Sequence, residues 1–226
     1  MPAAPRPNWT REFSHRAWIH ALWKLLGISG FMWLFFIAYF HLLRHPVHPV
    51  TVMPLTPLDR AIPFQPQWLL AYVSLWLYTG IAPGLLLTMR ELLRYGLWAA
   101  GLCLSGLACF YFWPTAVPEL ALDLSGYPGF AVLQGVDAAG NACPSLHVAA
   151  AVFSAFWIDL LFRKIETPGG MRLANLLWLG AIVYSTLAIK QHVVLDAIAG
   201  NLLGTLFALL SMGGRWHGLA RLPNPG

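Results

Sequence analysis

Five residues in the C-terminal half of the chain have the types and spacing needed for phosphoryl transfer. They are Ser145, His147, Lys190, His192 and Asp196. Residues four apart on a helix share a face, so the Asp196 carboxylate can hold one ring nitrogen of His192 and leave the other as a nucleophile. A second histidine, His147, can then protonate the leaving oxygen and afterwards activate the incoming water or alcohol. This chemistry requires no divalent metal and no other cofactor.

The sequence around Ser145 predicts a site for a phosphate. Pro144 is placed to open a helix from its first turn, whose free backbone N–H groups attract anions. The Ser145 hydroxyl adds a further donor and Lys190 adds a positive charge. The alternative for Ser145 is an ordinary helix cap, a common role of serine.

The spacing of the two histidines predicts that they meet at one membrane surface. Forty-five residues separate His147 from His192, which is enough for two crossings of about 20 residues each and a short turn. A chain that crosses and returns places both histidines at the outer ends of neighbouring helices.

The composition is that of a membrane protein. The chain is 58% hydrophobic and 10% charged, with a mean hydropathy of +0.62, whereas soluble domains carry about 25% charged residues. The net charge of +5 does not indicate a nucleic-acid partner, because the basic residues stand between apolar segments. The three cysteines, Cys103, Cys109 and Cys143, give no disulfide framework.

We expect an all-α fold, a single membrane domain over residues 1–226 with six transmembrane helices. The predicted spans are residues 22–43, 68–89, 95–113, 144–162, 173–189 and 192–212. Pro83 predicts a kink in the second span, Arg90 and Arg94 a turn before the third, and the proline-rich residues 44–67 an interfacial loop. The first span is expected to remain as an anchor, because no cleavage site follows it.

The distribution of basic residues predicts that both termini are cytoplasmic. Of the 14 Lys and Arg, only Arg44, Arg60 and Lys190 then fall on the outer side. Residues 114–143 contain no Lys or Arg and should face outward. Their acidic residues, Glu119, Asp123 and Asp137, are a candidate selector for a neutral or cationic acceptor.

Together the motifs resemble those of the type 2 phosphatidic acid phosphatase superfamily. The resemblance lies in Pro-Ser-x-His at residues 144–147 and His-x-x-x-Asp at residues 192–196, each opening a helix of a six-span protein. It implies that Ser145 and His147 serve as the family's phosphate-binding serine and acid histidine. His192 then corresponds to the nucleophile and Asp196 to its aspartate.

Two departures from the family's pattern concern phosphate-binding cations. The first motif, Lys and six residues before Arg-Pro, has no counterpart in residues 106–120, and Ser185-Thr186 stands where the third motif normally starts Ser-Arg. Lys190 is the replacement that the sequence shows nearby. These departures resemble the inositol phosphorylceramide and sphingomyelin synthase-like phosphotransferases, whose upstream motifs are similar to residues 54–59 and 90–96.

Other interpretations of single residues remain open. His147, His192 and Asp196 could form a two-histidine, one-carboxylate metal site, or His192 and Asp196 a buried structural pair. His41, His45 and His48 could bind metal, although Pro46 interrupts their helix. Asp159 and Arg163 are expected to form a structural ion pair. The glycines listed next are assigned to close helix packing, within the chain or in a homodimer. They are Gly96, Gly101, Gly106, Gly200 and Gly204.

The leading prediction is a lipid phosphate or diphosphate phosphatase that acts through a phosphohistidine at the outer membrane face, which is the periplasmic face of the inner membrane in a bacterium. A lipid headgroup phosphotransferase shares every step except the last, in which an alcohol replaces water. A membrane scaffold or transporter without catalysis is the alternative from another class. The expected partner is a membrane lipid, with a homodimer possible through the glycines.

Overall fold

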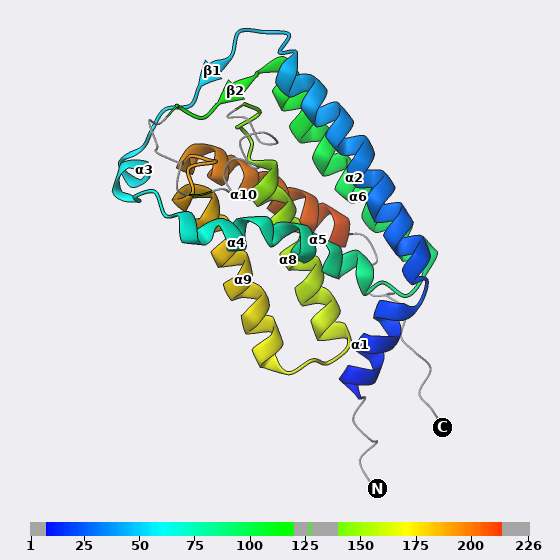
Figure 1. Cartoon of the computed structure of the whole chain (residues 1–226). Helices are drawn as coiled ribbons and strands as arrows, with labels where there is room; N and C mark the ends of the chain where they lie inside the picture. Colours follow the sequence, from blue (N-terminus) through cyan, green and yellow to red (C-terminus); the bar gives the residue numbers. More distant parts are fainter. Residues whose placement is uncertain (1–7, 120–126, 128–139, 214–226) are drawn as a thin grey trace, which may run out of the picture.

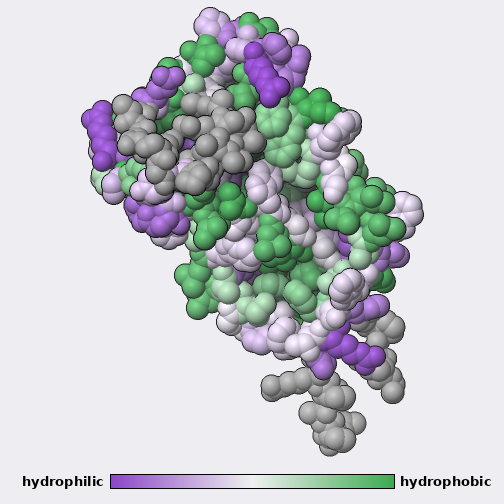
Figure 2. All heavy atoms as spheres, in the orientation of Figure 1, coloured by the Kyte–Doolittle hydropathy of each residue, from purple (hydrophilic) through white to green (hydrophobic). Residues whose placement is uncertain are grey.

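The computed structural model describes residues 8–119, 127 and 140–213. Most of this part of the chain is helical, and it contains five helices long and apolar enough to cross a membrane. They are α2 (Ala21–Arg44), α6 (Met89–Phe112), α8 (Leu146–Lys164), α9 (Gly169–Ala188) and α10 (Val194–Met212). Figure 2 shows hydrophobic residues over much of the middle of one face and the most hydrophilic residues toward its ends. The protein is therefore a membrane protein with a mostly helical fold.

Shorter elements connect these helices. They are α1 (Trp9–Trp18), β1 (Thr51–Val52), α3 (Pro57–Ala61), the 3-10 helix η1 (Pro66–Trp68), α4 (Leu69–Val73), α5 (Leu75–Gly84) and β2 (Thr115–Ala116). The two strands pair in parallel, with Thr51 opposite Thr115. This pairing joins the segment after α2 to the segment after α6, so these two helices end at the same end of the molecule (Figure 1).

Helix α8 forms the centre of the bundle and packs against α5, α9 and α10. Of its apolar window 61% is buried, compared with 0% for α2, which lies at the edge. Buried hydrogen bonds connect these helices. Tyr78 donates to the Asn175 side chain at 2.7 Å, and Asn175 donates to the carbonyl of Ala155 at 3.0 Å. These bonds join α5 to α9, and α9 to α8, the helix that carries His147.

Glycines allow α10 to approach α8 at the level of the backbone. A Cβ added to Gly200 would lie 2.3 Å from the carbonyl oxygen of Ser145, and one added to Gly204 would lie 2.4 Å from that of Ala149. Gly101 and Gly106 likewise face Phe207 and Leu146, whereas Gly96 has open space around it. The packing role of four of the five glycines is thus within the chain, and Gly96 does not share it.

The expected second span, residues 68–89, is not one continuous helix. It consists of η1, α4 and α5, with the break at Ser74 and not at Pro83, which lies in the last turn of α5. The Ser74 hydroxyl bonds back to the carbonyl of Ala71 at 2.6 Å and accepts a bond from Trp178 at 2.8 Å. A side chain that competes for backbone carbonyls in this way bends a helix.

Two other sequence expectations were wrong at helix starts. Arg90 and Arg94 lie inside α6 and not in a turn before it, because Thr88 and Glu91 form a capping box that starts the helix at Met89. Pro144 precedes α8, whose N-cap is Ser145, and is not in its first turn. Asp159, in contrast, pairs with Arg163 at 2.7 Å as expected, and also with Arg172 at 2.6 Å.

Some expectations lie outside the described residues. Of the three acidic residues between 114 and 143, Glu119 is described, but Asp123 and Asp137 are not. The basic residues near the chain ends, Arg6, Arg215 and Arg221, also lie outside this part.

Candidate active site

The nucleophile predicted from the sequence lies beside its predicted aspartate. The Nδ1 atom of His192 is 3.2 Å from Oδ2 of Asp196, and the Asp196 side chain is fully buried. The sequence had suggested that His192 lies on α10, but His192 precedes this helix by two residues. The four-residue spacing still brings the two side chains together. Because a carboxylate accepts, Nδ1 carries the ring hydrogen and Nε2 keeps its lone pair.

The second histidine lies at the start of the neighbouring helix. The ring centroids of His147 and His192 are 6.5 Å apart. Tyr72 of α4 stacks on His147, with centroids 4.0 Å apart and an angle of 16° between the ring planes. Among the described residues the buried Nε2 atom of His147 has no hydrogen-bond partner. The ring is thus positioned by α4, and its Nε2 atom is available.

Ser145 lies at the contact between the two helices. Its hydroxyl caps α8 by accepting from the amide of Val148 at 3.2 Å, and its own amide donates to the carbonyl of Asp196 at 3.0 Å. The residue is fully buried. The ordinary cap role is therefore present, and it leaves the hydroxyl hydrogen to be donated elsewhere.

The ammonium group of Lys190 binds backbone carbonyls in residues 45–65, the segment between α2 and η1. It donates to the carbonyls of Asp59, at 2.8 Å, and of Ile62. An ammonium has three donors, so one remains after these two bonds. Burial lowers the pKa of Lys190 from its ordinary value, and the nearby Asp59 carboxylate opposes that effect.

Asp59 is a residue of this site that sequence reasoning missed. Its Oδ2 atom caps α3 through Thr56 at 2.7 Å, and its Oδ1 atom accepts the amide of Val194, at the start of α10, at 2.8 Å. The carbonyl of Asp59 receives Lys190. Asp59 therefore binds the chain on both sides of His192. The Thr-x-x-Asp pattern is a sequence signal for the cap, but it carries no information about Val194.

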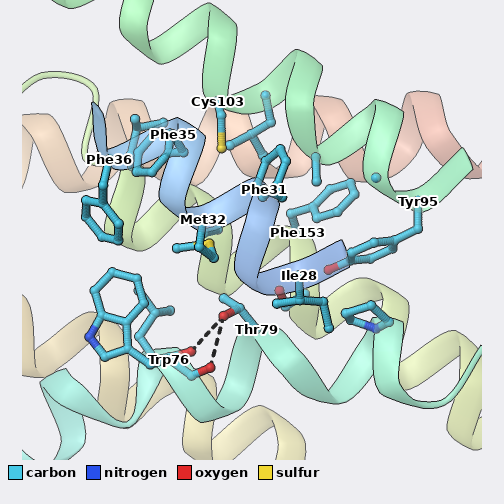
Figure 3. Close-up of a pocket in the computed structure, with 18 of the residues that line it drawn as sticks. Ile28, Phe31, Met32, Phe35, Phe36, Trp76, Thr79, Tyr95, Cys103 and Phe153 are labelled. Carbon is cyan, nitrogen blue, oxygen red and sulfur yellow. Dashed lines mark hydrogen bonds between the residues drawn. The ribbon is translucent and has the colours of Figure 1, made fainter. Parts of the chain in front are cut away.

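Two cavities meet at His192. The larger, of about 890 Å³, is mostly apolar and lies between α2, α5, α6 and α8, with His147 and His192 among its lining residues. Figure 3 shows side chains of these helices, among them Phe31, Trp76 and Phe153, pointing into it. Ser145 and Asp196 line neither this cavity nor the next.

The smaller cavity, of about 310 Å³, has charged residues in its lining beside apolar ones. It is lined by Leu55, Asp59, Arg60, Ile62, Val117, Lys190, His192 and Val193. In the described residues no group of three His, Cys, Asp or Glu is arranged to hold a metal ion. Neither of the two alternatives, a metal site of His147, His192 and Asp196 or one of His41, His45 and His48, is therefore found among these residues.

Comparison with known proteins identifies the family but gives no individual relative. Neither the curated proteins nor the solved structures include a match to this chain. The family model described as the PAP2 superfamily matches residues 56–210. This range begins just before α3 and covers both histidine motifs. Since this range is more than half of the chain, the protein belongs to the PAP2 superfamily, the type 2 phosphatidic acid phosphatases, and is a lipid enzyme of the phosphatase or phosphotransferase kind.

Proposed function

We propose that this protein cleaves phosphate or diphosphate esters of long-chain lipids through a phosphohistidine. The observation that carries the proposal is the contact of His192 with Asp196 at 3.2 Å, with His147 6.5 Å away between ring centroids. Both histidines are among the residues that line an apolar cavity of about 890 Å³. A site of this size, lined by apolar side chains with few polar groups, suits an amphiphile.

In the first step Nε2 of His192 attacks phosphorus and the bond from phosphorus to the lipid oxygen breaks. His147 gives that oxygen a proton, so the lipid leaves as an alcohol or a monophosphate. Asp196 stabilises the charge that develops on His192. In the second step His147 takes a proton from water, the water oxygen attacks phosphorus, and the phosphorus–nitrogen bond breaks.

Ser145 and Lys190 are the proposed phosphate-binding residues of this reaction. Lys190 has one donor left after its two carbonyl bonds, and the Ser145 hydroxyl retains its hydrogen. The buried, unpartnered Nε2 atom of His147 supports its role, because a bound ester oxygen would supply the missing partner.

We also propose six crossings, with both termini cytoplasmic and the histidines at the outer, periplasmic face. The support is the course of residues 66–84. Gln65 bonds to Ala188, at the end of the bundle near His192, whereas Gly84 accepts Lys24, near the start of α2. Since α2 and α6 run in the same direction, the chain between them must return across the membrane. Residues 66–84, which form short helices, number 19, close to the roughly 20 residues that a helical crossing needs.

The test uses the full chain purified in detergent with EDTA. Phosphatidate and an isoprenoid diphosphate are offered, with and without ceramide or diacylglycerol plus an inositol lipid, and free phosphate and new lipids are measured. We expect phosphate release that persists in EDTA and disappears in His192→Ala. His48→Ala, a change in an exposed histidine that contacts Tyr111, is the matched control and should retain activity.

Each other outcome contradicts a stated part of the proposal. A new phospholipid without free phosphate would replace the hydrolase with a headgroup phosphotransferase. Loss of activity in EDTA that zinc or magnesium restores would contradict the metal-independent route. An inactive wild-type protein would return the chain to the scaffold or transporter class.

A further inference from the structure

We propose that Arg60 is a phosphate-binding residue of this site, supplying the positive charge that the histidine motifs lack. This inference rests on the proposed function, because the phosphate is that of the substrate. Arg60 lines the smaller cavity together with Lys190 and His192. Two basic residues therefore share the lining of this cavity with the residue that is proposed to attack phosphorus.

The position of Arg60 is fixed by its neighbour. The carbonyl of Asp59 accepts from Lys190 at 2.8 Å and its carboxylate accepts from the amide of Val194 at 2.8 Å. These two contacts lie on either side of His192 in the sequence. The short helix α3 is thus attached to the chain that carries the nucleophile, and the next residue on α3 is Arg60.

Arg60 is better placed than Lys190 to supply most of the binding. Two of the three Lys190 donors are used by the carbonyls of Asp59 and Ile62. Arg60 is exposed, and within the described part of the chain no carboxylate forms an ion pair with it. A guanidinium has five donors in a planar fork that matches two phosphate oxygens. The larger cavity would then hold the lipid chains, and the phosphate would lie at His192, which lines both cavities.

Inorganic phosphate is the probe for this inference. Thermal unfolding of the full chain in detergent is followed over a range of sodium phosphate concentrations at ionic strength held constant with sodium chloride. A ligand that binds the folded state raises the unfolding temperature by an amount set by the ratio of its concentration to its Kd, so the dependence of this temperature on phosphate concentration gives the Kd. Loss of a charge-assisted phosphate contact should raise the Kd about 10- to 100-fold in Arg60→Gln. Arg60→Lys should restore part of the affinity.

Arg44→Gln is the matched control. Arg44 is an exposed arginine on the proposed outer side whose guanidinium lies over the ring of Phe40, and it lines neither cavity. Its neutralisation should leave phosphate affinity within about twofold. Equal effects of the two substitutions, an unchanged affinity in Arg60→Gln, or a wild-type protein that phosphate does not stabilise would each overturn the assignment.

Turnover separates this inference from the proposed function. In the lipid phosphatase assay Arg60→Gln should raise KM at least tenfold, while His192→Ala abolishes kcat. A wild-type protein that binds phosphate through Arg60 but releases none from any lipid would refute the catalytic proposal alone. Active protein whose KM does not change in Arg60→Gln would refute the role of Arg60 alone.

Discussion

The carboxylate of Asp59 accepts the backbone amide of Val194 at 2.8 Å, across 135 positions of the chain. This bond fixes the start of α10, the helix that carries Asp196, against α3. The same carboxylate caps α3, and the residue is buried. A side chain that lines the smaller cavity thus also sets the geometry of the proposed nucleophile.

Asp59→Ala should therefore reduce turnover without removing any group that reacts. Loss of a cap costs about 1 kcal/mol of stability, and a displacement of about 1 Å of His192 can lower the rate about 100-fold. We expect kcat to fall at least tenfold, measured with thermal unfolding on the same preparations. Glu119→Gln, which removes a carboxylate from the same side, is the control. A full kcat in Asp59→Ala would show that α10 keeps its position without this bond.

Gly200→Ala should destabilise the fold. The added Cβ would lie 2.3 Å from the carbonyl oxygen of Ser145, a backbone atom that cannot rotate away. Overpacking of this kind costs about 1–3 kcal/mol, which lowers the unfolding temperature. Gly180→Ala is the control, because its Cβ would meet nothing within 4 Å; it should be neutral or stabilising, since Ala is favoured over Gly in helices by about 1 kcal/mol. Equal stability of the two variants would contradict the close contact of α8 and α10.

Tyr72 should act through the orientation of His147. The two rings stack at 4.0 Å, so Tyr72→Ala removes the surface that holds the imidazole. We expect a loss of at least tenfold in kcat with a smaller change in KM, because positioning affects the chemical step. Tyr72→Phe keeps the aromatic face and should stay within about threefold. A loss in Tyr72→Phe equal to that in Tyr72→Ala would instead assign the effect to the hydroxyl.

Filling the larger cavity should discriminate between substrates by chain length. Gly96 of α6 lines it and has open space around it, so Gly96→Leu adds a side chain without a backbone clash. We expect KM for a long-chain lipid phosphate to rise about tenfold, while a short-chain soluble phosphate ester is turned over as before. Gly180→Leu, on α9 and outside the cavity, is the control. An equal rise for both esters would place the lipid chains elsewhere.

Lys190 should give KM an alkaline limit. Burial lowers the pKa of this ammonium below its ordinary value, with Asp59 opposing the shift. The cation is present below that pKa and is lost as the pH rises through it, so phosphate binding should weaken at a lower pH than an exposed lysine would allow. His192, Asp59 and Arg60 line the same cavity. Lys190→Arg keeps the positive charge at alkaline pH and should remove the limit. A limit that persists in Lys190→Arg would assign it to another group.

The sequence predicted the helical membrane fold and the meeting of the two histidine motifs, because long apolar runs and the spacing of His147 and His192 are local properties of the chain. The contact of His192 with Asp196 followed from a four-residue separation, even though His192 lies just outside the helix. Asp159 and Arg163 followed from the same rule.

The remaining features depend on contacts between distant segments. The interruption at Ser74 involves Trp178, the stacking on His147 involves Tyr72, and the role of Asp59 depends on Val194. None of these pairs has a sequence signal, because each is created by the packing of separate elements. The start of α6 was missed for another reason: the basic residues Arg90 and Arg94 suggested a turn, whereas the capping box of Thr88 and Glu91 begins a helix before them.

His192 lines both cavities. One is apolar and lies between the helices, and the other has the charged residues Asp59, Arg60 and Lys190 in its lining. For a lipid phosphate cleaved at His192, the two products would have separate exits. The lipid alcohol could return sideways to the bilayer while the phosphate departs to the aqueous side, and neither would need to pass the other. Release of one product would then not depend on release of the other, and an accumulating lipid product would compete with substrate for the larger cavity without blocking the departure of phosphate.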